Sequence, residues 1–313
     1  MKVQIEQLRR TMSQEYEPSS FEFVSSYFEQ FMEKEFGDGG LAELFHENTK
    51  YTDQESLELG ESAAMFSNDP SMEYAQAKLK PDYRGKERLD LPDPDELDAR
   101  IDDVLASRRS QRDQSGEGLS LQELSTLLDH SCGTTGSQRI EPDEDDPFSD
   151  VEKPFRAYAS GGALYPSEIY LAVVNEGENL DRGLYYYVPE DHALRVLRKP
   201  DEDEDFAQSV DDLFATPQDV FDHQSCAVKF LITGAFWRSK AKYGPRGYRF
   251  VLQETGHLGQ NVLLVAEAMG LAAVPLASFY DDKVNEFLDI DGVDEAVTYT
   301  LSIGKSESGD THE

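Results

Sequence analysis

The stretch KYGPRGYRFVLQETGHLGQNVLLVAEAMGLAAVPLAS, residues 242–278, is the most informative about the fold, because a turn, a long helix and a strand follow one another within it. The Gly-Pro pair at 244–245 predicts a tight turn. Residues 253–270 predict a helix, and this helix is apolar nearly all round between Val262 and Met269, so we expect it to be buried. Residues 272–276 then predict a strand.

The same region opens with a run of cations. Five basic side chains fall in the twelve residues from Arg238 to Arg249, with no acid among them, whereas the whole chain has 63 Asp+Glu against 29 Lys+Arg. The net charge of −34 argues against nucleic acid as a partner, because binding phosphates needs a broad face of Lys and Arg. We interpret the excess acid as adaptation to molar intracellular salt, where the screening length falls to roughly 3 Å.

Composition excludes several other classes of protein. The two cysteines, Cys132 and Cys226, cannot form a CxxC pair or a four-ligand zinc site, and the six histidines are dispersed, so we expect no metal. The N-terminus lacks an apolar signal core and no run of 18 apolar residues occurs, so we expect a cytoplasmic protein without a membrane span. The chain is only 38% hydrophobic, but 17 Phe and 15 Tyr can fill a packed core.

The chain divides by composition into three parts. We expect an N-terminal extension over residues 1–95, with helices at 21–36 and 41–47, a main domain over 96–306, and an acidic tail over 307–313. Pro92 and Pro94 mark the first boundary, before a helix expected at 95–110 with Leu97, Ile101, Val104 and Leu105 on one face. The extension could bind a leader peptide, contact a partner enzyme or cover a dimer.

The main domain mixes helices and strands without regular βαβ alternation. Ser120 and Glu123 form a capping box that predicts a helix start. Strands are expected at 168–174, 183–188, 228–236, 272–276 and 296–303. This order predicts an α+β fold with a mixed, mainly antiparallel sheet flanked by helices. Neither GxGxxG after a strand nor GxxxxGK[ST] occurs, which excludes the usual dinucleotide and P-loop sites.

Three segments could hold an anionic, planar ligand. Arg108, Arg109, Ser110 and Arg112 could bind a dianionic phosphate by charge-assisted bonds, or they could complement the end of a helix. The glycines of Ser160-Gly161-Gly162-Ala163 would let a flat ligand approach the backbone, or they could form an ordinary turn. Pro275-Leu276-Ala277-Ser278 could lie against a planar ring, or it could be a plain strand exit.

A fourth segment carries acid–base chemistry. Lys242 and Tyr243 are adjacent, and a cation near a tyrosine favours its ionised form, while burial opposes charging either group. Such a pair could transfer a proton in a dry site. The alternative is a solvated basic loop that pairs with the acidic surface.

Taken together and in this order, these segments resemble the nitroreductase superfamily of FMN proteins, and most closely its SagB/ThcOx-type thiazoline/oxazoline dehydrogenase branch. The similarity covers residues 97–305 and rests on RRSQR, SGGALYPSEIYLAV, GLYYYVPEDHAL, KYGPRGYRFVLQETGHLGQNVLLVAEAMGLAAVPLASF and the final SIGK. The ordered set KYGxRGYR–ETGH–QN is its most specific part. LFHENTKYT also resembles the leader region of this branch.

The resemblance implies a role for each matching position. Arg108, Ser110 and Arg112, with Arg109 beside them, would hold the FMN phosphate and ribityl chain, and Gly304 and Lys305 would return to the phosphate. Ser160, Gly161, Gly162 and Ala163 would come from the partner subunit of a homodimer, and Pro275, Leu276, Ala277 and Ser278 would face the isoalloxazine. Lys242 and Tyr243 match the catalytic pair. Ala163 replaces an Asn usual in the superfamily, and a further phosphate cation of longer relatives does not follow Lys305.

The function implied is FMN-dependent dehydrogenation of azoline heterocycles to azoles in a ribosomally made peptide, with a cyclodehydratase as a partner. Two alternatives stay open. One is a general NAD(P)H-dependent nitroreductase or quinone reductase. The other is a flavin-free acidic interaction protein, in which the arginines merely end a helix.

Overall fold

The computed structural model describes residues 41–51, 60, 64, 83–139, 152–201 and 205–307. The chain divides into two compact units, Met1–Glu58 and Leu59–Glu313. In the first unit, helix α3 (Leu41–Asn48) confirms the helix expected at 41–47. The helix expected at 21–36 and nearly all of the acidic tail lie outside the described residues. The boundary at residue 95 stays a prediction.

The second unit is built on a seven-stranded sheet. Its strands are β1 (Arg88–Asp90), β4 (Ser167–Val173), β5 (Gly183–Val188), β6 (Ala193–Arg198), β7 (Val228–Ala235), β8 (Ala272–Leu276) and β9 (Glu295–Gly304). Their order is β1-β6-β5-β4-β7-β9-β8, and every pair is antiparallel. The predicted α+β fold with a mainly antiparallel sheet is therefore confirmed. A separate hairpin pairs β2 (Thr134–Arg139) with β3 (Glu152–Arg156).

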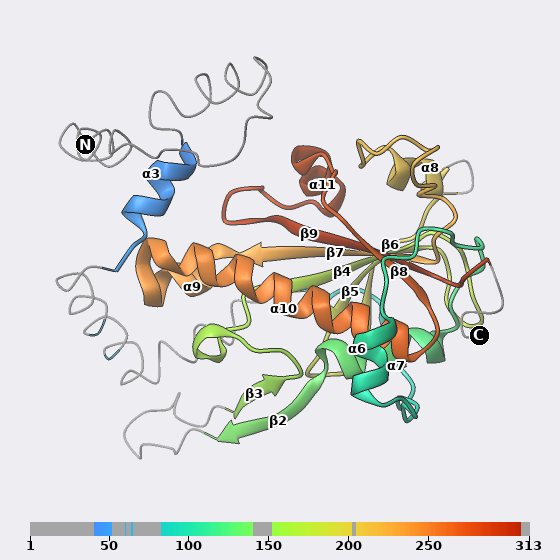
Figure 1. The fold of residues 1–313 in the computed structure, drawn as a ribbon, viewed down its shortest axis with the longest axis horizontal. Coiled ribbons are helices and arrows are strands. Elements are labelled where there is room, and N and C mark those ends of the chain that lie inside the picture. The colour runs from blue at the N-terminus through green and yellow to red at the C-terminus, as the bar shows by residue number, and fades with distance from the viewer. Residues whose placement is uncertain are drawn as a thin grey trace, which may run out of the picture. The chain divides into compact units, whose positions relative to one another are not determined.

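Helices cover both faces of the sheet (Figure 1). They are α6 (Ile101–Ser107), α7 (Leu121–Cys132), α8 (Phe206–Asp211), α9 (Phe236–Tyr243), α10 (Gly247–Ala268) and α11 (Asp281–Leu288), with short 3₁₀ turns η1 (Gly161–Ala163) and η2 (Gly244–Arg246). Helices α7 and α10 lie on one side of the sheet, and α8 and α11 lie on the other.

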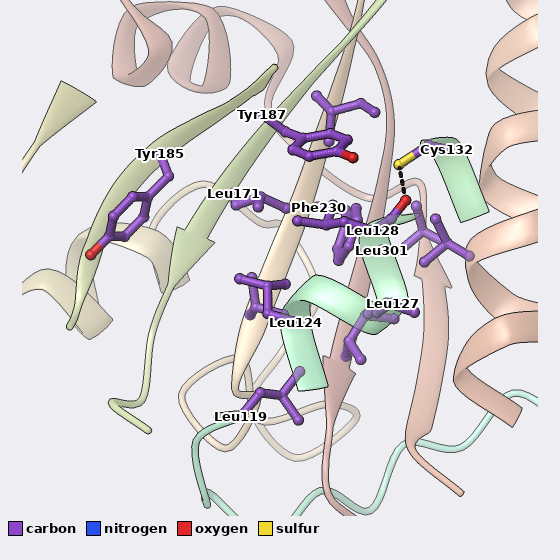
Figure 2. Packing of buried hydrophobic residues seen from close by; sticks show 14 of the residues in the cluster. Leu119, Leu124, Leu127, Leu128, Cys132, Leu171, Tyr185, Tyr187, Phe230 and Leu301 are labelled. Carbon is purple, nitrogen blue, oxygen red and sulfur yellow. Dashed lines mark hydrogen bonds between the residues drawn. The ribbon is translucent and has the colours of Figure 1, made fainter. Parts of the chain in front are cut away.

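Strand β4 shows why both faces are apolar. Side chains alternate across a strand, so Ile169 and Leu171 join the core under α7 and α10, whereas Tyr170 and Ala172 join the core under α8 and α11. All residues of β4 and β7 are buried. Figure 2 shows the first core, where leucines of α7 meet Leu171 and Leu301 of the sheet.

The capping box predicted at Ser120 is present. The Ser120 hydroxyl accepts a hydrogen bond from the Glu123 amide at 3.1 Å, and the Glu123 carboxylate accepts one from the Ser120 amide at 2.7 Å. These two bonds satisfy amides that the first turn of a helix leaves unpaired. Helix α7 begins at the next residue, where the sequence predicts it.

The helix expected at 95–110 is shorter than predicted. The Asp95 amide donates to Thr126 Oγ1 at 3.0 Å, and the Asp95 carbonyl lies 2.8 Å from His130 Nε2. These bonds to α7 hold the chain before α6 in an extended conformation, so α6 begins only at Ile101. Of the expected apolar face, Val104 alone is buried, whereas Ile101 is 64% exposed and Leu105 60% exposed.

Candidate active site

The predicted site residues gather in two places within one chain. The first, which we call the arginine cluster, consists of Arg108–Arg112, Pro275–Ser278, Gly304 and Lys305. The second, the lysine–tyrosine cluster, consists of Ser160–Ala163, Lys242 and Tyr243. In Figure 1, α9, which ends at Tyr243, lies at one end of α10, and α6, which ends just before Arg108, lies at the other. The Lys-Tyr pair and the arginines therefore lie near opposite ends of α10, while β8 runs back from the arginine end along β9.

Backbone hydrogen bonds assemble the arginine cluster. The Gln111 amide donates to the Ala273 carbonyl of β8 at 2.9 Å, and the Ser115 amide donates to the Lys305 carbonyl at 2.9 Å. The segment that carries the arginines therefore runs along β8 and past the end of β9. Three segments that are far apart in the sequence meet at this edge of the sheet.

The side chains of the arginine cluster are not equivalent. Arg109 donates from Nη1 to the carbonyls of Ala106 at 3.0 Å and Arg108 at 2.8 Å, so its guanidinium satisfies the end of α6. Arg108 is half-buried and Arg112 is exposed. Among the described residues, no carboxylate lies within ion-pair distance of either of these two arginines. Arg108 and Arg112 can therefore take an external anion.

The strand β8 forms the other wall of this cluster. It is the edge strand of the sheet, where a proline such as Pro275 is tolerated because it cannot donate to a neighbouring strand. Leu276 is buried and its carbonyl accepts a hydrogen bond from Thr300 Oγ1 at 2.7 Å. Ala277 and Ser278 are exposed at the strand exit. Lys305 is near Glu123, with 3.5 Å between Nζ and Oε1.

The lysine–tyrosine cluster lies where α9 turns into α10. Gly244 has φ of 56° and ψ of −149°, a conformation that suits glycine, and it creates the turn predicted at 244–245. Lys242 is buried and Tyr243 is half-buried. The Lys242 ammonium lies 5.7 Å from the centre of the Tyr243 ring. The Tyr243 ring meets Phe250 edge-to-face with 5.0 Å between centroids.

Gly162 makes room for the Tyr243 hydroxyl and the Lys242 ammonium. A β-carbon at this position would lie 2.5 Å from the Tyr243 hydroxyl and 3.4 Å from Lys242 Nζ. The glycine also has φ of 69°, which a side chain would disfavour. The Ser160–Ala163 segment and the Lys-Tyr pair of the same chain are therefore in direct contact.

The residues after Gly162 are held in unusual backbone conformations. Ala163 has φ of 52° and Tyr165 has φ of 45°, although neither is a glycine. Such residues cost about 1–3 kcal/mol each and persist only where their surroundings impose them. Here the Tyr165 amide donates to Ser160 Oγ at 2.9 Å, and Arg238 Nη1 donates to the Tyr165 carbonyl at 2.9 Å.

A model of the nitroreductase family matches residues 105–305. This chain belongs to the nitroreductase family. It is therefore an oxidoreductase of that superfamily, as the motifs predicted. Within the described part of this nitroreductase, no group of three or more His, Cys, Asp or Glu could hold a metal ion. Nor does any described helix have both the length and the apolar character to cross a membrane.

Three curated proteins show this similarity at the level of sequence. The nitroreductase-family protein MJ1384 of Methanocaldococcus jannaschii is 33% identical over 203 residues, which are 64% of this chain and 89% of that protein. The microcin B17-processing protein McbC of Escherichia coli is 32% identical over 139 residues, 44% of this chain and 49% of McbC. The trifolitoxin-processing protein TfxB of Rhizobium leguminosarum bv. trifolii is 25% identical over 191 residues, 61% of this chain and 48% of TfxB.

This nitroreductase thus spans about half of the length of the two processing proteins, which support the branch that the motifs indicated. Two solved structures agree on the fold. A nitroreductase from Anabaena variabilis is 27% identical with a TM-score of 0.56, over 73% of this chain and 43% of that chain. A chain of the Escherichia coli microcin synthetase McbBCD complex with truncated pro-MccB17 bound has a TM-score of 0.51 at 23% identity, over 86% of this chain and 98% of that chain.

Sequence reasoning missed the groups that support the lysine–tyrosine cluster of this nitroreductase. Arg238, one of the five cations of the basic stretch, is only 1% exposed and forms an ion pair with Glu168, which is also buried. Glu254 is buried beneath Ser160 and accepts a hydrogen bond from the Ser167 amide at 3.1 Å. Burial raises the pKa of Glu254 above its usual value, while a bond from the Ser160 hydroxyl opposes this rise.

One signal in the sequence could have indicated these residues. Glu168 begins an otherwise apolar strand, and Glu254 lies on the face of α10 that also carries Val251 and Leu258. A carboxylate in such a position must have a partner inside the protein, because burying an unpaired charge is costly. The partner of Glu168 is Arg238.

Proposed function

We propose that this chain is an FMN-dependent dehydrogenase that converts azoline heterocycles to azoles in a ribosomally made peptide. The observation that carries the proposal is the presence of two complementary clusters in one fold. One has arginines without carboxylate partners among the described residues, and the other has a lysine and a tyrosine packed against a glycine. The names of McbC and TfxB, which process microcin B17 and trifolitoxin, support a peptide as the substrate.

The arginine cluster fits the phosphate end of FMN. Two guanidiniums and the Ser110 hydroxyl can bind a dianionic phosphate, and Lys305 adds a third cation at the end of β9. The exposed exit of β8, Ala277 and Ser278, offers backbone groups to a planar ring. Bound FMN would supply the hydride acceptor, and the protein would supply position and acid–base groups.

We further propose that two copies of the chain complete each site. The helix α10 has 22 residues and is therefore about 33 Å long. Tyr243 lies near one end of it and Arg108 near the other, so one copy cannot present both to the same flavin. A two-fold dimer would set the lysine–tyrosine cluster of one copy beside the arginine cluster of the other. Tyr248 and Leu252, one turn apart on α10, are exposed apolar residues that such a dimer can cover.

The roles of Lys242 and Tyr243 follow from their environment. An azoline becomes an azole by losing a proton from Cα and a hydride from the adjacent ring carbon. We propose that the Tyr243 oxygen accepts the Cα proton and that the Lys242 ammonium stabilises negative charge on that oxygen. Phe250 limits the orientation of the tyrosine ring. Dioxygen or another external oxidant takes the two electrons and completes the turnover.

The test is the visible spectrum of the protein purified in high salt, followed by Tyr243→Phe. We expect flavin absorbance in both proteins and a rate of azole formation about 10²–10⁴-fold lower in the variant, the usual range for a positioned acid or base. Tyr248→Phe is the matched control, because Tyr248 lies five residues further on and stacks on Phe236 instead. Full turnover by Tyr243→Phe with FMN bound would exclude Tyr243 as the base, and a colourless protein would exclude the flavoenzyme.

One further measurement separates the peptide dehydrogenase from a general nitroreductase. MJ1384 and the Anabaena variabilis protein carry the nitroreductase name, so this second function has support. A general nitroreductase takes its electrons from NAD(P)H, which would bleach the bound flavin rapidly. We expect slow or no bleaching by NAD(P)H and rapid bleaching by an azoline peptide.

A further inference from the structure

A buried lysine, Lys229 of β7, lies in the sheet near the arginine cluster. Lys229 of β7 is fully buried, and its Nζ donates to Ser302 Oγ and to His223 Nδ1, each at 3.0 Å. In the part of the chain that the structure describes, no carboxylate lies within ion-pair distance of Lys229. Burying a cation without a counter-ion is costly, so the fold retains this lysine against a substantial penalty.

Aromatic rings take the place of a counter-ion. The Lys229 ammonium lies 4.6 Å from the centre of the Phe221 ring and 5.0 Å from that of Phe214. Phe214 also stacks on His223 at 4.2 Å. Burial and then the charge of Lys229 lower the pKa of His223 to about 3, so His223 is neutral near pH 7. Burial lowers the pKa of Lys229 as well, and the ring faces of Phe214 and Phe221 favour its charged form electrostatically.

A chain of hydrogen bonds connects Lys229 to the segment that carries the arginines. Ser302 Oγ, which accepts from Lys229, donates to Gln114 Oε1 at 3.2 Å. The side-chain nitrogen Nε2 of Gln114 donates to the carbonyl of Ala272 at 3.3 Å. Gln114 therefore links β8 to β9, only two residues after Arg112. The chain runs from the interior of the sheet to its edge.

The absence of a side chain at Gly304 leaves space for the side chain of Gln114. A β-carbon on Gly304 would lie 3.0 Å from Gln114 Oε1 and 3.2 Å from Gln114 Cβ. The glutamine side chain, only 2% exposed, thus fills the space that a larger residue would take. The Gln111–Ala273 and Ser115–Lys305 backbone bonds flank it on both sides. Movement of Gln114 would displace Arg112 relative to Lys305.

We propose that Lys229 is a positioning residue for phosphate recognition, acting through Ser302 and Gln114 on the spacing between Arg112 and Lys305. The inference rests on the proposed function, because the phosphate is that of FMN. A buried ammonium also keeps its field in molar salt, where the exposed arginines are screened within roughly 3 Å. Lys229 would therefore matter for the phosphate and not for the flavin ring.

The experiment compares the affinities of FMN and riboflavin, which differ only in the phosphate. For Lys229→Met, we expect the Kd of FMN to rise about tenfold and the Kd of riboflavin to stay within about twofold of the wild-type value. Lys283→Met is the matched control, because it removes the same charge from an exposed lysine that bonds the Asp212 carbonyl. It should change neither Kd.

Ser302→Ala removes the middle of the hydrogen-bond chain. It tests the positioning role of Lys229 if Lys229→Met does not fold. Like Lys229→Met, Ser302→Ala should weaken the binding of FMN more than the binding of riboflavin. An equal loss for both ligands, or an unchanged ratio in both variants, would refute the positioning role. If the wild-type protein binds riboflavin and FMN equally, the inference fails although the flavoenzyme stands. If it binds neither, the proposed function fails as well.

Discussion

The two ends of α10 differ in what holds their side chains. At the lysine–tyrosine end, buried side chains fix the geometry: Arg238 is paired with Glu168 and bonds the Tyr165 carbonyl, and Gly162 touches the Tyr243 hydroxyl. At the arginine end, backbone bonds between neighbouring segments fix the position, and Arg112 is exposed. An acid–base pair needs its reacting atoms placed to within a fraction of an ångström, so its side chains are fixed directly. The cations at the arginine end are side chains on a segment whose spacing is set by backbone bonds and by Gln114.

This difference has a consequence for substitutions. A change at the lysine–tyrosine end should affect stability or rate strongly, because Arg238 and Glu168 are buried as an ion pair and Gly162 is packed against the Tyr243 hydroxyl. A change at the arginine end should affect affinity, and the effect should depend on salt. The following substitutions test the contrast in order of decreasing effect.

The largest effect is expected from Arg238→Met. It leaves Glu168 buried without its ion-pair partner, which should lower the free energy of unfolding by about 3–5 kcal/mol. Arg100→Met is the matched control, since Arg100 is exposed and pairs with Asp102 at the surface, where loss of a salt bridge should change the free energy of unfolding little. Urea unfolding in high salt measures both. A loss below about 1 kcal/mol for Arg238→Met would show that the lysine–tyrosine end is less rigid than its contacts indicate.

Gly162→Ala should come next. The new methyl group would lie 2.5 Å from the Tyr243 hydroxyl and would occupy a backbone with φ of 69°. We expect the rate of azole formation to fall about 10²-fold, as for a displacement of about 1 Å in a site, with FMN content unchanged. Gly270→Ala is the control, because its backbone has nearly the same φ, 70°, but its methyl group would meet nothing within 4 Å. Equal rates for the two variants would remove Gly162 from the site.

Arg112→Ala should have a moderate effect. Loss of one guanidinium from the phosphate site should raise the Kd of FMN about tenfold, without a change in the rate at saturating FMN. The effect should shrink as KCl rises over the range in which the protein stays folded, because salt screens an exposed charge. Arg109→Ala is the comparison, since that guanidinium bonds the end of α6. A larger loss for Arg109→Ala would reverse the assignment of the two arginines.

Glu254→Gln should give the smallest effect, a change in pH dependence. Burial raises the pKa of Glu254, so the folded chain holds this proton more tightly than the unfolded chain does. The resulting stabilisation is complete below the unfolded pKa near 4.5 and is lost as the pH rises through the folded value. The variant has no such proton, so its free energy of unfolding lacks this pH dependence. The difference between variant and wild type should therefore shift in favour of the variant as the pH rises. Parallel stability curves would contradict this.

Local patterns in the sequence predicted much of the fold. The capping box at Ser120 and the strand at 272–276 appear where expected, because each depends on neighbouring residues alone. The basic stretch was not expected to be helical, yet residues 236–243 form α9. The cations interrupt the apolar spacing expected of a buried helix. The structure explains this, because Arg238 faces the interior and is paired there with Glu168. Glu168 in an apolar strand indicates that a buried partner exists, but a pairing across 70 residues leaves no local signal of which residue that partner is.

The residues of the candidate site follow from the motifs and stay a prediction, whereas their arrangement in space could not be predicted from the sequence. Each residue implied by the motifs lies either in the arginine cluster or in the lysine–tyrosine cluster. The motifs indicate these residues because the cations, glycines and tyrosine are visible in the sequence itself. Their separation by the length of α10 depends on tertiary packing. The contact of Gly162 with Tyr243 joins residues 81 positions apart. Lys229 is the one charged residue of an apolar strand, but the sequence does not show that its partners are Ser302 and His223.

The placement of the clusters at opposite ends of one helix has a genetic consequence. In the proposed dimer, each active centre draws its arginines from one polypeptide and its tyrosine from the other. A subunit that lacks Tyr243 and a subunit that lacks Arg108 and Arg112 would each be inactive alone, but a hybrid of the two would contain one intact centre and one doubly defective centre. Co-expression of the two genes should therefore restore about a quarter of the wild-type activity by complementation between alleles.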